Sequence, residues 1–112
     1  MKTIGNILSV LAFATLFAVA PDAKAAQTVQ VTMVGCDSGG ECWIHISPSL
    51  TGTGCSQGGS QVRFSTASGP QAQWKTATSA FLAGKNLVVE PNIGSSTCSG
   101  GFPTALWLGM TN

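Results

Sequence analysis

Charged side chains are scarce in this 112-residue sequence and make up 8% of it. After residue 25 the chain carries three basic and three acidic side chains, so its formal charge is zero: Arg63, Lys75 and Lys85 against Asp37, Glu41 and Glu90. Nucleic acids require clusters of Lys and Arg that neutralise phosphates, and anionic membrane surfaces attract similar clusters. The scarcity of charge therefore argues against both partners, and it is compatible with neutral ligands such as sugars.

Catalytic motifs are also absent. The only histidine, His45, lies beside Trp43 in a strand-like segment, and no G-x-S-x-G turn occurs that would supply a nucleophile for it. Asp37 and Glu41 are expected to share a hairpin tip away from Glu90, which leaves no carboxylate pair for glycoside hydrolysis. We therefore predict that the protein is not an enzyme and needs no cofactor.

The first 25 residues resemble an export signal. Lys2 supplies a positive start, residues 4–20 form an almost uncharged apolar run, and small residues precede a cleavage site after Ala25. Cleavage after Ala20 is less favoured because Pro21 would follow the cut. An uncleaved membrane anchor is the alternative, although about 17 apolar residues is the short limit for crossing a bilayer. We expect an exported protein, periplasmic or secreted.

Residues 26–112 suffice for one small domain with a marginal hydrophobic core. This part holds all four cysteines, Cys36, Cys42, Cys55 and Cys98. An even number of cysteines in a short exported chain predicts two disulfides. A zinc site is the alternative, but its ligand pairs are usually two to four residues apart, and every gap between successive cysteines here is wider. We expect no metal.

Five short segments have the alternation or apolar character of β-strands: 28–34, 42–47, 61–66, 87–90 and 104–110. In the first segment, Val29, Val31 and Met33 are expected to share the buried face. The last segment is apolar on both faces, so we expect it to be buried centrally or to lie at a contact between chains.

One segment, residues 71–84, has a helical period, with apolar side chains along one stripe: Trp74, Ala77, Thr78, Phe81 and Leu82. Pro70 suits a first helical turn, and Gly84 suits a left-handed C-terminal cap. The helix falls between the third and fourth strands. We expect its stripe, Phe81 included, to plug the core.

The order strand, strand, strand, helix, strand, strand resembles the OB fold, a five-stranded Greek-key barrel. We therefore predict a mainly β fold with one helix, an OB-like five-stranded β-barrel over residues 26–112. Among exported proteins, this order and size are similar to the binding subunits of bacterial AB5-type toxins. That resemblance implies assembly into rings of five and recognition of cell-surface glycans.

The barrel topology also predicts the disulfide pairing. If the first strand runs up, the second runs down, and so does the fourth, which pairs antiparallel with the first. The loops that carry Cys55 and Cys98 then leave the barrel at the same end, while Cys36 and Cys42 flank one hairpin. Of the three possible connectivities, we expect Cys36 with Cys42 and Cys55 with Cys98.

The same topology places Trp43, His45 and Arg63 on the outer face of the second and third strands, which OB folds commonly use for ligands. These side chains could stack on a sugar and hydrogen-bond to it. In the alternative interpretation, Trp43 packs under a loop or against a neighbouring chain. Two functions therefore stay open. One is a secreted, oligomeric recognition module for a glycan or another cell-surface ligand, and the other is a small exported protein that acts by protein contact, as an inhibitor or envelope accessory.

Overall fold

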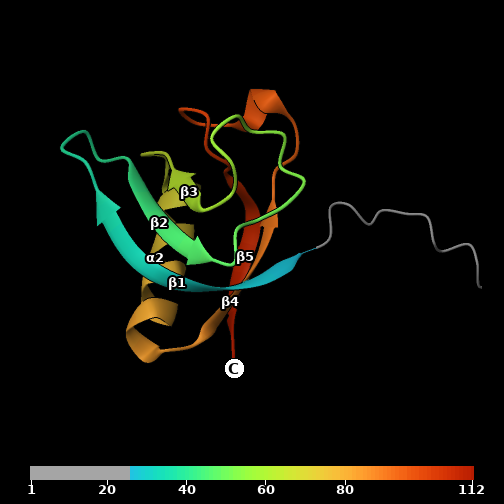
Figure 1. The fold of residues 1–112 in the computed structure, drawn as a ribbon. Helices are drawn as coiled ribbons and strands as arrows, with labels where there is room; N and C mark the ends of the chain where they lie inside the picture. Colours follow the sequence, from blue (N-terminus) through green and yellow to red (C-terminus); the bar gives the residue numbers. More distant parts are fainter. Residues whose placement is uncertain (1–25) are drawn as a thin grey trace, which may run out of the picture.

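The computed structural model describes residues 26–112, and the expected export signal over 1–25 lies outside the described residues. The elements follow in the order β1 (Gln27–Cys36), β2 (Cys42–Ser47), β3 (Gln61–Phe64), α2 (Ser68–Ala83), β4 (Asn86–Pro91), η3 (Ser95–Thr97) and β5 (Ala105–Thr111). The five strands form one antiparallel sheet in the order β3-β2-β1-β4-β5 (Figure 1). The predicted fold class, mainly β with one helix and an OB-like order of elements, is confirmed.

The long strand β1 joins the two parts of this sheet. Its first residues pair with β4, and its later residues pair with β2, so β1 sweeps across the molecule in Figure 1. The outermost strands, β3 and β5, approach each other. The backbone N–H of Arg63 in β3 donates to the backbone carbonyl of Pro103, two residues before β5, at 2.9 Å. This bond draws the two ends of the sheet together, so the sheet curls toward a barrel.

A register shift in β1 overturns one predicted side-chain orientation. Val29 and Val31 are buried as expected, but Met33 is 49% exposed. The register shifts between Val31 and Met33, which pairs with His45 on β2. An extra residue at a β-bulge reverses which face the following side chains occupy. Val34, rather than Met33, therefore packs against the core.

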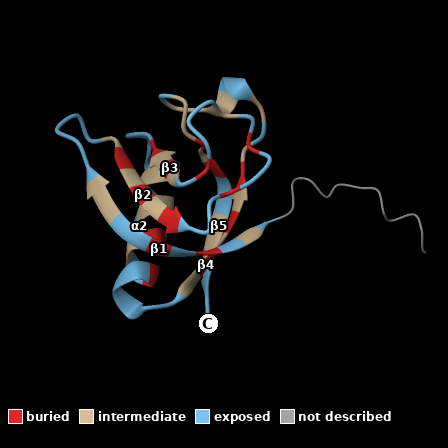
Figure 2. Ribbon diagram, viewed as in Figure 1, coloured by how far each residue is buried: buried red, intermediate tan, exposed pale blue. Residues whose placement is uncertain are grey.

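The core is formed by the inner face of the sheet and is shown as red segments in Figure 2. The inward side chains predicted for the second and third strands are all buried: Ile44, Ile46, Val62 and Phe64. Leu87 and Val89 of β4 complete this face. Alternation along β2 and β3 thus predicts both faces correctly, which fixes the outer face that carries the candidate site.

The helix α2 begins three residues before the predicted 71–84 range and places Pro70 in its first turn, as expected. Gly84 forms the predicted left-handed cap, with φ 68°. Its N–H donates to the carbonyl of Phe81 at 3.3 Å, and the N–H of Lys85 donates to that of Ala80 at 2.9 Å. These bonds satisfy carbonyls that the end of a helix leaves without partners.

The predicted helix stripe is confirmed at Trp74 and Ala77, which pack against or within the core, and is wrong at Phe81 and Leu82. The fully buried helix residues are Ala77 and Ala80, whereas Phe81 is 38% exposed and Leu82 is 78% exposed. Methyl side chains allow the helix backbone to lie close to the sheet, and α2 contacts all five strands. Large side chains at 81 and 82 are consequently turned outward, so Phe81 does not plug the core.

The predicted central burial of the last strand is also wrong. β5 lies at the edge of the sheet and, within residues 26–112, pairs with one strand only, β4. Leu106, Trp107 and Met110 are large exposed apolar side chains. The other expectation, a contact between chains, stays a prediction.

Both predicted disulfides are confirmed, Cys36 with Cys42 across the first hairpin and Cys55 with Cys98 between two long loops. The two loops lie side by side in Figure 1. The N–H of Gly94 donates to the carbonyl of Thr53 at 3.1 Å. The second bridge spans 43 residues, and closing a loop of this size stabilises a fold by about 4 kcal/mol on chain-entropy arguments.

Candidate functional site

The outer face of β2 and β3 carries a row of polar and aromatic side chains. The strand register pairs Trp43 with Arg63 and His45 with Gln61. Paired residues of antiparallel strands project to the same face. The structure therefore brings together the three residues expected to bind a ligand, Trp43, His45 and Arg63, and adds Gln61 to them.

Trp43 is held against the neighbouring strand β1. A Cβ atom at Gly35, its register partner, would come within 2.8 Å of Cζ2 of the Trp43 ring, so the ring lies on the glycine backbone. The backbone carbonyl of Trp43 accepts a hydrogen bond from the indole N–H of Trp74 in α2 at 3.2 Å. The ring is thus fixed on the sheet itself, supported by a residue that has no side chain.

Arg63 lies close to two aromatic rings and one carboxylate. Its guanidinium carbon is 4.7 Å from the centroid of the Phe102 ring and 6.0 Å from that of Trp43. Its Nη1 atom is 3.7 Å from Oε1 of Glu41. The Arg63 side chain is 25% exposed, so the ion pair is partly screened by water, whereas the stacking on Phe102 restricts the plane of the guanidinium.

A side-chain amide links Arg63 to His45. The Nε–H of Arg63 donates to Oε1 of Gln61. The Nε2 atom of Gln61 lies 2.8 Å from Nε2 of His45, within hydrogen-bonding distance. Three side chains from β2 and β3 thus form one continuous chain of hydrogen bonds along the outer face, from His45 through Gln61 to Arg63.

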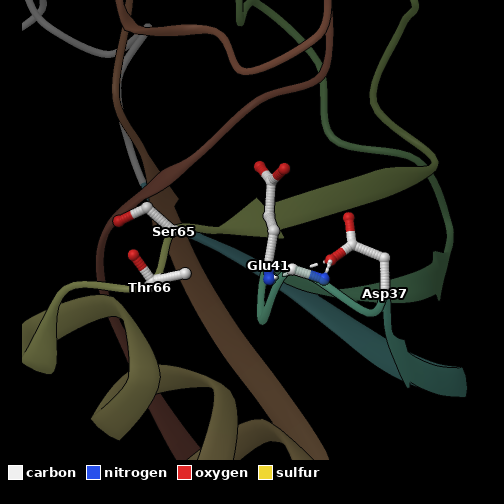
Figure 3. A pocket seen from close by; sticks show the side chains of 5 residues that line it. Asp37, Glu41, Ser65 and Thr66 are labelled. Atoms are coloured by element: carbon white, nitrogen blue, oxygen red, sulfur yellow. Dashed lines mark hydrogen bonds between the residues drawn. The ribbon is translucent and has the colours of Figure 1, made fainter.

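An open polar pocket of about 360 Å³ lies at the end of this row, at the tip of the first hairpin. It is lined by Asp37, Gly39, Glu41, Ser65 and Thr66. Figure 3 shows Glu41 standing between Asp37 and the two hydroxyl side chains. Oδ1 of Asp37 accepts hydrogen bonds from the N–H groups of Gly39 at 2.9 Å and Glu41 at 3.1 Å. The backbone at the tip is therefore ordered by one aspartate.

Glu41 belongs to both the pocket and the row. Its Oε1 faces Arg63, and its Oε2 accepts a hydrogen bond from the hydroxyl of Ser99 at 2.6 Å. Ser99 comes from the long loop between β4 and β5, the same loop that supplies Phe102. This loop reaches across to the first hairpin and forms one border of the outer face. The pocket and the row are therefore one continuous surface, which we call the β2–β3 face: Trp43, His45, Gln61, Arg63, Phe102 and the pocket residues.

The predicted site residues were Trp43, His45 and Arg63 alone. Gln61, Phe102 and the pocket residues were not expected to belong to the site, and neither was Gly35 expected to support the Trp43 ring. The signal for Gln61 was available, because it alternates with Arg63 along the same strand face. Glu41 was expected at the hairpin tip but without a partner, and Phe102 lies in a glycine-rich loop that has no periodicity. Nothing in a single sequence places such a loop over a particular strand.

The β2–β3 face combines an aromatic ring with groups that donate and accept hydrogen bonds. Its positive charge, Arg63, lies beside the negative charge of Glu41, and Asp37 at the pocket is the one further charged side chain of the face. Within residues 26–112, no group of three or more His, Cys, Asp and Glu side chains is placed to hold a metal ion. In the same residues, no helix is long and apolar enough to span a membrane. The composition of the face suits a neutral, hydroxyl-rich ligand.

Comparison with protein-family models, with curated proteins and with solved structures finds no match to this chain.

Proposed function

We propose that the protein is an exported, disulfide-stabilised binding module that recognises a glycan through its β2–β3 face. The observation that carries this proposal is the linked row of Trp43, Arg63, Gln61 and His45, held in register by two paired strands. A sugar presents an apolar face of C–H groups and a rim of hydroxyls. The Trp43 ring offers a stacking surface for the former, and the polar side chains offer partners for the latter.

The OB assignment and the kinship with binding subunits of AB5-type toxins are parts of the same proposal. They are supported by the strand order and by the hydrogen bond from Arg63 to Pro103 that draws the sheet closed. An OB barrel presents its second and third strands to ligands, and those strands carry the row described above. Under this proposal the mature chain assembles into a ring, and each copy offers one β2–β3 face.

A glycan array probed with the purified mature protein tests the proposed ligand class. We expect binding that Trp43→Ala weakens by tenfold or more, because loss of a stacking ring at a binding site commonly costs over about 1.4 kcal/mol. Trp107→Ala is the matched control, since Trp107 is also a partly exposed tryptophan but lies on β5. The proposal fails if no glycan binds, or if both variants lose binding equally while remaining folded.

A second candidate function, action by protein contact, is favoured by the exposed apolar side chains of β5. Leu106, Trp107 and Met110 lie on an edge strand, and edge strands readily pair with another chain. Light scattering on the purified protein separates the two functions. A stable pentamer supports the ring-forming recognition module, and a strict monomer removes the support for a ring and favours an inhibitor or envelope accessory.

A further inference from the structure

The order of donors and acceptors along the β2–β3 face is set by its arginine. The Nε–H of Arg63 can only donate, so the group of Gln61 that faces it has to be the amide oxygen, as observed. The NH₂ group of Gln61 consequently points to His45. An amide NH₂ also can only donate, which leaves one role for the facing ring nitrogen, Nε2 of His45: it accepts.

An accepting Nε2 atom defines the protonation state of His45. A histidine ring whose Nε2 accepts carries its proton on Nδ1. Free imidazole side chains in water favour the opposite tautomer, with the proton on Nε2. The arrangement therefore imposes on His45 a tautomer that an unconstrained side chain would not prefer. The constraint originates at Arg63 and reaches His45 through the amide of Gln61.

We propose that His45 makes the β2–β3 face sensitive to protons, such that protonation of its ring uncouples Gln61 from Arg63. A protonated His45 carries N–H groups on both ring nitrogens, so its Nε2–H would meet the NH₂ group of Gln61. The amide would have to rotate and present its oxygen to His45. Its NH₂ group would then face the Nε–H of Arg63, donor against donor. One amide can satisfy Arg63 or protonated His45, but not both.

Few charged side chains lie near His45, so the competition for the Gln61 amide is the main effect expected when the ring is protonated. The strands next to it contribute one charged side chain, since β1 and the chain from 46 to 60 contain none and β3 contains Arg63 alone. Glu41, on the far side of Arg63, is the nearest carboxylate along the row. When Gln61 turns away, Arg63 keeps its contacts with Glu41 and Phe102 and loses the acceptor that fixed its Nε–H.

The inference rests on the proposed function only for its consequence, which is that ligand binding responds to pH. Protonation of His45 rearranges the groups that orient Arg63, so a ligand recognised by the unprotonated arrangement binds more weakly once the ring is protonated. Loss of one hydrogen bond to a charged group corresponds to about a tenfold change in affinity. Such a module would retain its ligand at neutral pH and release it on acidification.

Nuclear magnetic resonance tests the coupling without any ligand. His45 is the only histidine in the sequence, and Arg63 is the only arginine, so the imidazole nitrogens and the arginine Nε–H each give one set of signals. We expect the Nδ1–H tautomer at neutral pH. On acidification, the Arg63 Nε–H and the Gln61 amide signals should shift with the same midpoint as His45, while backbone amides of β4 and β5 stay unchanged.

Two variants sharpen this test. In Gln61→Ala, the Arg63 signal should no longer follow the protonation of His45, whereas Gln73→Ala, a glutamine of α2, should preserve the coupling. The proposal is overturned if the wild-type ring carries its proton on Nε2 at neutral pH, or if the Arg63 Nε–H signal ignores the His45 titration.

The glycan array run at neutral and mildly acidic pH addresses the consequence. We expect about tenfold weaker binding in acid for the wild type and a smaller pH effect for Gln61→Ala. Equal binding at both pH values overturns the regulatory role. An array without binding at either pH instead overturns the proposed function, and the resonance measurements still decide whether the coupling exists.

Discussion

The Trp43 ring lies so close to Gly35 that a Cβ atom at position 35 would come within 2.8 Å of its Cζ2 atom. The two residues are register partners on β2 and β1. The Trp43 ring of the β2–β3 face thus packs directly on the backbone of Gly35 and covers it. The residue at position 35 therefore determines the position of the Trp43 ring, the proposed stacking surface.

Gly35→Ala should therefore displace Trp43 and destabilise the fold by about 1 to 3 kcal/mol, the usual cost of forcing extra volume into a packed site. Urea unfolding followed by tryptophan fluorescence measures the change. Gly69→Ala is the matched control, because a Cβ atom there meets nothing within 4 Å and its φ is not positive. Equal stability of the two variants would mean that the Trp43 ring moves freely off β1.

Replacing Arg63 should show that its shape matters as much as its charge. Arg63→Lys keeps the positive charge but loses both the planar group that stacks on Phe102 and the Nε–H that binds Gln61. We expect Arg63→Lys to resemble Arg63→Ala in releasing His45 to the common Nε2–H tautomer, as read from the imidazole nitrogen signals. In Glu41→Gln the tautomer should be retained, since Glu41 does not bind Gln61.

The two disulfides should differ in their contribution to stability. Cys55 and Cys98 are 43 residues apart, whereas Cys36 and Cys42 are 6 apart. Chain-entropy arguments give about 4 kcal/mol for the longer loop and about 2 kcal/mol for the shorter one. We expect the double Ser variant at 55 and 98 to unfold at markedly lower urea than the double Ser variant at 36 and 42. The reverse order would show that the first hairpin depends more strongly on its bridge.

Alternation along β2 and β3 was enough to predict three residues of the candidate site, Trp43, His45 and Arg63. Ile44, Ile46, Val62 and Phe64 are buried as expected, which places the intervening residues outward. The disulfide pairing followed from strand directions, and Gly84 was identifiable because few residues other than glycine adopt a left-handed helix cap. Features that depend on a single strand or a single turn were therefore predicted correctly from the sequence.

Features that depend on contacts between distant segments could not be predicted in this way. The bulge that turns Met33 outward arises from how β1 passes from β4 to β2, and the sequence of β1 alone does not encode it. The position of Phe102 depends on a loop that crosses to the first hairpin, where Ser99 binds Glu41. The contents of the site were thus visible in part, but its border was not.

The helix gives the last prediction, because its packing matches the expectation from sequence at Ala77 and departs from it at Phe81. Ala77 is fully buried between α2 and the sheet, whereas Phe81 is 38% exposed. Ala77→Asp should prevent folding, since it places an unpaired carboxylate in the core, while Phe81→Asp should remain folded with a loss of about 1 kcal/mol or less. Circular dichroism and urea unfolding of both variants compare them directly. An unfolded Phe81→Asp protein would show that the core extends to the C-terminal end of the stripe that the sequence period indicates.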